Sequence, residues 1–358
     1  MRIGRPRLKV LSGIQLGRMF SMPGPLDSLR PKGGFGVGSS VRVQVPATLA
    51  QIAGFGIGST GKAISAVSIA ESAGFGIGGN STAQAFSGLL DQYPGAAVAY
   101  SMRRLSSTYS GPLVTIRRGN DNAEKDFYPD ASQELSLTST DGAGTDLNTW
   151  IGSENGFIKT WYDQSGNANN AEQLTASAQA QIINSGALNT NNSKAALNTN
   201  GANNYFVFDS FATNGMALLA VGNNTAYGTI ISGGDDVSNR FDYGPRIINS
   251  YRYFVAVSGA NDTLDSGTNV LSNYLFEAYK DAGTFGYTYL NASVESSGTM
   301  AYNLQSYTNT NKLFTRNFGG GNSDYIAGVW NEILIFPTDQ TANRTAIETN
   351  INNFYSIY

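Results

Sequence analysis

Carboxylates, lysines and tyrosines are the side chains of this sequence that could carry acid–base or nucleophilic chemistry. The 358 residues contain no Cys and no His. This composition excludes Ser-His-Asp triads, thiolate nucleophiles and zinc sites built on Cys or His. Any catalysis by this chain would therefore depend on carboxylates, Lys or Tyr.

One short motif places oxygen-bearing side chains at alternate positions. Asp163, Ser165, Asn167 and Asn169 follow the pattern that begins a calcium loop. The twelfth position of an EF-hand loop requires Glu and is Leu174 here, so that motif fails. Asx-turns explain the same pattern without a metal. We expect no cofactor, with Asp163 and Asn167 as the fallback ligands if a Ca²⁺ ion binds.

Aromatic side chains could bind a ligand, because an exposed ring can stack on a sugar. Trp161 and Trp330 lie in apolar strand-like runs, so we expect both in the core. Trp150 closes a polar segment, while Tyr251 and Tyr253 belong to a stretch rich in Tyr and Asn. Such stretches form adaptable recognition surfaces. The candidate ligand-binding residues are therefore Trp150, Tyr251 and Tyr253.

The elements that must position these side chains are short β-type runs from Gln92 onward. Gly, Asn and Asp separate the runs, which include 113–117, 156–162, 216–221, 251–257 and 329–336. Many short strands at this spacing predict an all-β sandwich. Two helices are also expected, over residues 89–104 and after the helix-start signal at Pro337. The second would place Ala346, Ile347, Ile351 and Phe354 on one face.

A Gly-Phe-Gly-[Val/Ile]-Gly pentapeptide occurs at 34–38, 54–58 and 74–78, a spacing of 20 residues. In each copy both apolar side chains fall on one face of an extended segment, and the glycines leave the other face bare. Three such repeats are too few to bury a core alone. We expect them to pair with neighbouring chains or a partner surface in a homo-oligomer, with a trimer favoured; a flexible linker is the alternative. The oligomerisation residues would be Phe35, Val37, Phe55, Ile57, Phe75 and Ile77.

Charge is uneven along the chain, whose net charge is −3. Residues 1–32 carry seven Arg and Lys against the single acidic residue Asp27, which suggests a docking segment or a solvated tail. The sequence shows no secretory signal and no apolar run long enough to span a membrane, and its net charge does not favour nucleic acid. We predict a basic arm over 1–32, a repeat stalk over 33–88 and a β-sandwich over 89–358.

Two stretches carry a resemblance to a known family. Residues 99–122 contain an Arg-Arg-Gly-Asn-Asp run, and residues 161–169 read Trp-Tyr-Asp-Gln-Ser-Gly-Asn-Ala-Asn. Together they resemble the catalytic module of fungal-type α-L-arabinofuranosidase B. The segment 328–336 and the helix expected after it are similar to the closing elements of concanavalin A-like (laminin G-like) domains. The resemblance covers roughly residues 93–358 and implies a concanavalin A-like jelly-roll β-sandwich, a module that also occurs in phage particle proteins.

The activity of that family requires two carboxylates beside the scissile bond. The resemblance implies a nucleophilic Glu after the mid-domain strands, and no Glu stands at the corresponding place here. Asp235 and Asp236 are the nearest carboxylates and are the fallback catalytic residues. No residue is assigned as the acid/base.

These observations favour a structural protein that presents a binding domain on a particle surface over a hydrolytic enzyme. We predict a non-enzymatic virion protein, a head fibre, decoration or tail-fibre component, made in the host cytoplasm and acting outside the cell. Residues 1–88 would contact other virion proteins, and the sandwich would bind host surface glycans. The alternatives are an arabinofuranosidase-like glycoside hydrolase and a bacterial surface lectin or adhesin.

Overall fold

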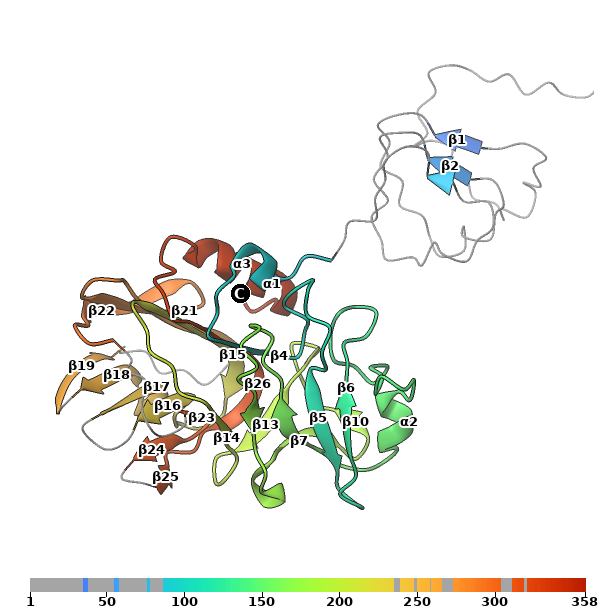
Figure 1. Cartoon of the computed structure of the whole chain (residues 1–358), viewed down its shortest axis with the longest axis horizontal. Helices are drawn as coiled ribbons and strands as arrows, with labels where there is room; N and C mark the ends of the chain where they lie inside the picture. Colours follow the sequence, from blue (N-terminus) through green and yellow to red (C-terminus); the bar gives the residue numbers. More distant parts are fainter. Residues whose placement is uncertain are drawn as a thin grey trace, which may run out of the picture. The chain divides into compact units, whose positions relative to one another are not determined.

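The computed structural model describes residues 35–37, 55–57, 76–77, 86–234, 239–247, 250–257, 259–265, 273–303, 311–318 and 321–358. The chain divides into two compact units, Met1–Ala85 and Phe86–Tyr358. The second unit is an all-β sandwich, as the sequence predicts (Figure 1). Within the described residues, no helix has the length and apolar character needed to cross a membrane.

The strands of the sandwich are short, and most pair antiparallel. Its first half contains β4 Val98–Ser101, β5 Val114–Arg118, β6 Glu124–Phe127, β7 Gly156–Trp161, β8 Ala171–Glu172, β9 Ala180–Asn184, β10 Ala187–Leu188, β11 Thr190–Asn191, β12 Lys194–Ala195, β13 Leu197–Asn200 and β14 Phe206–Phe208. Its second half contains β15 Met216–Asn224, β16 Ile231–Gly234, β17 Arg240–Ile247, β18 Ser250–Val257, β19 Ala260–Asp265, β20 Asn273–Lys280, β21 Phe285–Leu290, β22 Ser293–Thr299, β23 Asn311–Leu313, β24 Arg316–Phe318, β25 Gly321–Ser323 and β26 Ala327–Phe336. The helical segments are α1 Leu89–Gln92, α2 Leu147–Ile151, the 3-10 turn Ala176–Ala178 and α3 Arg344–Tyr355.

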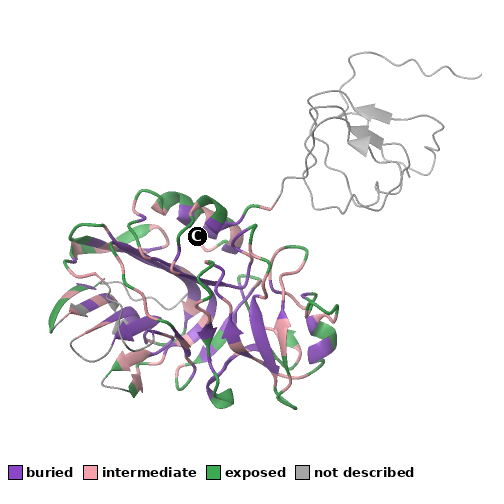
Figure 2. Cartoon of the chain, viewed as in Figure 1, coloured by how far each residue is buried: buried purple, intermediate pink, exposed green. Residues whose placement is uncertain are grey.

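The central sheet is buried on both faces (Figure 2). β15 pairs with β20 on one side and β26 on the other, and β26 continues to β4. Leu218 and Ala220 enter the main core between the sheets, whereas Ala217 and Leu219 enter a second core that includes residues of α1 and α3. Because both faces of β15 are covered, its sequence is a continuous apolar run instead of an alternating one.

Gly222 packs tightly against Trp330, one of the core tryptophans. A Cβ atom at this position would lie 2.4 Å from Cε3 of Trp330, a distance that no real side chain tolerates. Trp330 is fully buried, and its indole Nε1 donates to Oγ1 of Thr199 at 3.1 Å. Trp161 is also fully buried. The prediction that both tryptophans belong to the core is confirmed.

The helix expected over residues 89–104 is largely wrong. Only Leu89–Gln92 is helical, and the chain then forms strand β4. Pro94 and Gly95, the latter with φ of 89°, separate the two elements. Pairing with β26 overrides the local helix-like pattern, because it completes a sheet covered on both faces. The second expected helix is confirmed as α3, which buries Ile347 and Ile351 as predicted. Of the other two residues expected on this face, Ala346 is exposed and Phe354 is partly buried.

The glycine-rich repeats pair with one another inside the chain. β1 Phe35–Val37 pairs in parallel with β2 Phe55–Ile57, and β2 pairs in parallel with β3 Gly76–Ile77. Phe35 lies opposite Phe55, and Ile57 lies opposite Ile77, so the 20-residue spacing sets the register. These backbone pairs join repeats of one chain; the expected pairing with neighbouring chains or a partner surface stays a prediction. Phe75 lies outside the described residues.

Candidate functional site

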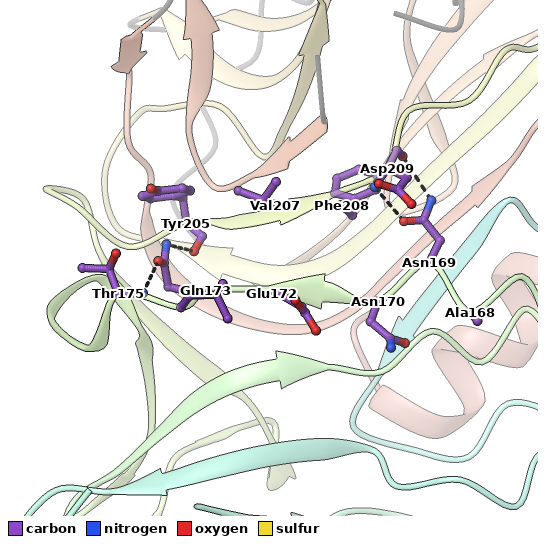
Figure 3. A pocket seen from close by; sticks show the side chains of 11 residues that line it. Ala168, Asn169, Asn170, Glu172, Gln173, Thr175, Tyr205, Val207, Phe208 and Asp209 are labelled. Carbon is purple, nitrogen blue, oxygen red and sulfur yellow. Dashed lines mark hydrogen bonds between the residues drawn. The ribbon is translucent and has the colours of Figure 1, made fainter. Parts of the chain in front are cut away.

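An open pocket of about 500 Å³ lies where β8 meets β14 (Figure 3). Its lining combines carboxylates, amides, two aromatic rings and one exposed leucine. The residues that line it are Ala168, Asn169, Asn170, Glu172, Gln173, Leu174, Thr175, Tyr205, Val207, Phe208 and Asp209. We call this the acidic pocket, because Glu172 and Asp209 are both exposed in it.

The 161–169 motif builds one wall of this pocket. The carboxylate of Asp163 accepts hydrogen bonds from the amides of Ala99, Ser165 and Asn169 and from the Ser165 hydroxyl, at 2.7–3.1 Å. Asn167 donates from Nδ2 to the carbonyls of Ala96 and Ala97, each at 3.0 Å. Both predicted calcium ligands thus hold the loop that carries Asn169. The motif acts in the described chain as a turn that positions its last residues at the pocket.

Side-chain amides fix the edges of the pocket. Asn169 accepts a hydrogen bond from the Asp209 amide at 2.7 Å and donates one to the Asp209 carbonyl at 3.1 Å (Figure 3). Nε2 of Gln173 donates to the Tyr205 carbonyl at 2.9 Å, while Oε1 of Gln173 accepts from the Thr175 amide at 2.9 Å. The backbone around both carboxylates is therefore held in place before any ligand arrives, which is what a binding site needs.

The two carboxylates come from one antiparallel strand pair, β8 and β14. Glu172 lies opposite Val207 in the antiparallel pair of β8 and β14, and Asp209 follows β14 directly. A pocket with two carboxyl groups and an adjacent Tyr205 can protonate an oxygen on a bound ligand and present a negative charge to it. Carboxylates and tyrosines are among the side chains that the sequence analysis left for catalysis.

The residues predicted to bind a ligand lie elsewhere. Trp150 is 8% exposed, its ring 5.3 Å from that of Phe127 and covered by the Arg118 guanidinium at 5.0 Å. Tyr253 is fully buried, with its ring 6.3 Å from that of Tyr243. The expectation that these two rings are exposed is wrong, because both serve the core. The side chain of Tyr251 is outside the described part of the chain.

The fallback catalytic residues, Asp235 and Asp236, also lie outside the described residues. The nearest described carboxylate along the chain is Asp242 on β17, which is fully buried. Its Oδ2 is 3.2 Å from Nε of Arg240 and 3.3 Å from Nε of Arg316. Asp242 is therefore part of a buried ionic cluster and is not open to a ligand.

The carboxylate with the most perturbed environment is Glu277, on β20. Burial first, and then the charge of the neighbouring Glu348 carboxylate, raise the pKa of Glu277 well above its usual range. Strongly perturbed carboxyl groups often mark active sites. Here Glu277 is fully buried and Glu348 is 2% exposed, so α3 covers the pair and no substrate can reach it.

Sequence reasoning missed Glu172, Asp209 and Tyr205. Of the residues that line the pocket, sequence analysis had singled out only Asn169, the last residue of the 161–169 motif, and Leu174, which excluded an EF-hand loop. Glu172 lies three positions after Asn169, but Asp209 reaches the pocket through the pairing of β8 with β14, which no local pattern reveals.

Several solved structures are similar to this chain. An arabinofuranosidase complexed with arabinofuranosyl-alpha-1,2-xylobiose is 18% identical, with a TM-score of 0.47 over 72% of this chain and 62% of that one. A mutant GH54 a-l-arabinofuranosidase soaked with 4-nitrophenyl a-l-arabinofuranoside is 17% identical, with a TM-score of 0.48 and the same coverage. The NanB sialidase from Streptococcus pneumoniae is 12% identical, with a TM-score of 0.32 over 37% of this chain and 23% of that one. The chain thus spans about 62% of the length of the arabinofuranosidase chains.

No curated protein matches the sequence. A family model does match, that of the alpha-L-arabinofuranosidase B catalytic domain, over residues 91–251. This match overturns the prediction of a non-enzymatic virion fibre or decoration protein, because it supports the glycoside hydrolase alternative and no finding indicates a virion. Over residues 91–251, the β-sandwich is similar to the catalytic domain of alpha-L-arabinofuranosidase B.

Proposed function

We propose that the β-sandwich is a glycoside hydrolase domain of the arabinofuranosidase type, which releases arabinofuranosyl units from a glycan. The observation that carries this proposal is the family match over residues 91–251. The acidic pocket supports it, because all of its lining residues, 168–209, lie inside the matched range.

Glu172 and Asp209 are the carboxylates that we assign to the reaction. One, as the acid, donates its proton to the glycosidic oxygen as the bond to the anomeric carbon breaks. The other either attacks the anomeric carbon or removes a proton from the attacking water. Separations of about 5–5.5 Å between the carboxyl groups go with retention, and about 6.5–9.5 Å with inversion. The stereochemistry of the product would therefore show which separation the Glu172 and Asp209 carboxyl groups adopt when substrate is bound.

The test is release of 4-nitrophenol from 4-nitrophenyl α-L-arabinofuranoside by the full chain. Glu172→Gln and Asp209→Asn keep the size of each side chain and remove its proton chemistry. Each is expected to lower kcat/KM by about 100-fold or more, the contribution of a positioned acid or base. Glu154→Gln is the matched control, since Glu154 lies outside the lining of the pocket and should leave the rate unchanged.

Two results would overturn the proposal. The first is a wild-type chain that releases no nitrophenol from the arabinofuranoside. The second is an active chain whose rate survives both substitutions, which would place the reaction at other carboxylates.

A further inference from the structure

A second open pocket, of about 510 Å³, lies on the outer face of the sheet formed by β5, β7, β9 and β13. Arg117 lies opposite Phe157, Phe157 opposite Gln181, and Gln181 opposite Asn198. These four residues form a row across four strands, so their side chains share one face of the sheet. Their neighbours Ile116, Ile158, Ile182 and Leu197 point into the main core. We call this site the arginine pocket.

The guanidinium of Arg117 is buried among neutral oxygen atoms. The residue is 8% exposed. Nε donates to Oε1 of Gln179 at 2.6 Å, Nη1 to Oδ1 of Asn122 at 2.8 Å and Nη2 to the Ala176 carbonyl at 3.2 Å. An arginine side chain has five N–H groups, so these bonds leave one on each terminal nitrogen.

No carboxylate pairs with Arg117 among the residues that the structure describes. Glu124 lies opposite Arg117 in the pair of β5 and β6, but Oε2 of Glu124 is 2.6 Å from Nζ of Lys159. The local group of Arg117, Lys159 and Glu124 therefore has an excess positive charge. The Glu124 charge also acts on Arg117, but Glu124 forms its ion pair with Lys159, so the guanidinium is only partly neutralised. Buried charges in proteins are normally paired, so such a guanidinium in an open pocket is a binding feature for an anion.

The remaining lining of the pocket suits a saccharide. It contains amides and a hydroxyl, from Gln179, Gln181, Asn198, Asn204 and Ser177, but no Asp, Glu or Lys. A side-chain amide can donate one hydrogen bond to a sugar hydroxyl and accept another at the same time. The ring of Phe157 adds an apolar surface, with the Arg117 guanidinium 4.8 Å from its centre. A carboxylate would be recognised by Arg117, and the hydroxyls around it by the amides.

Part of the lining is fixed and part is open. Nδ2 of Asn204 donates to the carbonyls of Ala178 and Gln179 at 3.2 and 3.1 Å, while Nε2 of Gln179 donates to the Gln173 carbonyl at 2.8 Å. The exposed side chain of Asn198, by contrast, makes no hydrogen bond within the described chain. The pocket thus offers a rigid guanidinium and a free amide.

The arginine pocket adjoins the acidic pocket along one stretch of chain. Gln173, Leu174 and Thr175 line the acidic pocket, and the next two residues, Ala176 and Ser177, line the arginine pocket. A turn at this boundary is closed by the Ala178 amide donating to the Thr175 carbonyl at 2.9 Å. Leu174, which lines the acidic pocket and is 73% exposed, directly precedes this turn.

We propose that the arginine pocket binds the carboxylate of a uronic acid residue in an acidic oligosaccharide. Arg117 pairs with the carboxylate through its two remaining N–H groups, and Asn198 and Gln181 contact the sugar hydroxyls. The site extends beyond the proposed hydrolysis, because it selects for acidic glycans through binding alone.

The test is calorimetric titration of the full chain with xylotriose that carries one glucuronic acid, and with unsubstituted xylotriose. The acidic sugar is expected to bind about 10-fold more tightly or better, and the difference should shrink between 20 mM and 500 mM salt as the ion pair is screened. Equal affinity for the two sugars, or no binding of either, would overturn the proposal. Neither readout requires hydrolysis, so failure here is separate from failure of the hydrolase assignment.

Variants locate the site. Arg117→Gln should abolish the preference for the acidic sugar, and circular dichroism would check that this partly buried change leaves the fold intact. Asn198→Ala, at an exposed position, should weaken binding of the acidic sugar severalfold even if Arg117→Gln fails to fold. Arg118→Gln is the matched control, because Arg118 pairs with Asp121 and lines neither pocket. Loss of binding on Glu172→Gln but not on Asn198→Ala would place the sugar in the acidic pocket instead.

Discussion

Two buried glutamates lie on the same face of the central sheet, under α3, in opposite electrostatic environments. Glu332 on β26 accepts hydrogen bonds from Arg103 to both carboxylate oxygens, at 2.8 and 3.1 Å. The Ser101 and Tyr355 hydroxyls also donate to it, at 2.7 and 3.1 Å. Among the described residues, Glu277 on β20 accepts a hydrogen bond from the Tyr279 hydroxyl at 3.1 Å, and its nearest charged neighbour is another carboxylate, Glu348. Arg344, which pairs with Glu348, acts on Glu277 more weakly and lowers its pKa.

Equal burial therefore has different consequences at the two sites. Burial alone would lower the pKa of Arg103, but the Glu332 carboxylate beside it raises that pKa, so Arg103 stays protonated. At Glu277, burial and the Glu348 charge act in the same direction and raise the pKa. The difference shows that a buried carboxyl group stabilises this fold when a cation reaches it and opposes folding at neutral pH when another carboxylate does.

Removing the cation from the Glu332 site should have the largest effect. Arg103→Met leaves the Glu332 carboxylate buried with only hydroxyl donors. The free energy of unfolding is expected to fall by about 3–5 kcal/mol, the cost of breaking one partner of a buried ion pair. Urea denaturation monitored by circular dichroism at pH 7 would measure it.

A surface ion pair provides the control for this change. Lys159→Met breaks the pair with Glu124, whose side chains are 31% and 37% exposed, and should cost within about 1 kcal/mol. The double variant Arg103→Met/Glu332→Met should recover much of the lost stability, because no charge is left buried. An Arg103→Met cost no larger than that of Lys159→Met would mean that water already compensates Glu332.

The same type of substitution should have opposite signs at the two glutamates. Since the folded-state pKa of Glu277 is raised, its contribution to stability is fully present below the unfolded value of about 4.3 and is lost as pH rises through the folded pKa. Glu277→Gln removes this loss and can donate to the Glu348 carboxylate. We expect a gain of about 1 kcal/mol in the free energy of unfolding at pH 8, the usual value of the one hydrogen bond gained.

Comparing pH values separates this effect from simple repacking. The gain from Glu277→Gln should shrink toward zero at pH 4, where Glu277 is protonated in the folded chain. Glu332→Gln should instead destabilise the chain at pH 8, because Arg103 loses its anion. A gain from Glu277→Gln that is the same at both pH values would show that the carboxylate charge is not the cause.

Local sequence patterns predicted the sandwich but not what its strands bring together. The apolar runs at 216–221 and 329–336 identify strands because both faces are buried, and the Pro337 signal identifies α3. The helix expected over 89–104 failed because a four-residue strand, Val98–Ser101, gains more from pairing with β26 than from its helix-like spacing.

The candidate sites show why sequence reasoning stops short of function here. Residues 163–169 form a local turn, so their motif could be recognised and it does reach the acidic pocket. Arg117, Phe157, Gln181 and Asn198 are up to 81 residues apart and meet only through strand register. Their spacing along the chain carries no period that would reveal the arginine pocket.

The smallest expected effect concerns the one hydroxyl that contacts Glu277. Tyr279→Phe removes this donor while keeping the ring, which is fully buried and packs edge-on against Tyr289 at 5.7 Å. Since the hydrogen bond from Tyr279 lowers the pKa of Glu277, its loss should raise that pKa further. We expect a cost of about 1 kcal/mol at pH 8, the usual value of a buried hydrogen bond, and a smaller cost at pH 4. Tyr287→Phe, on the neighbouring strand β21, is the matched control and should change stability little at either pH. An equal cost of Tyr279→Phe at both pH values would mean that the hydroxyl does not respond to the charge on Glu277, and that its role is confined to packing.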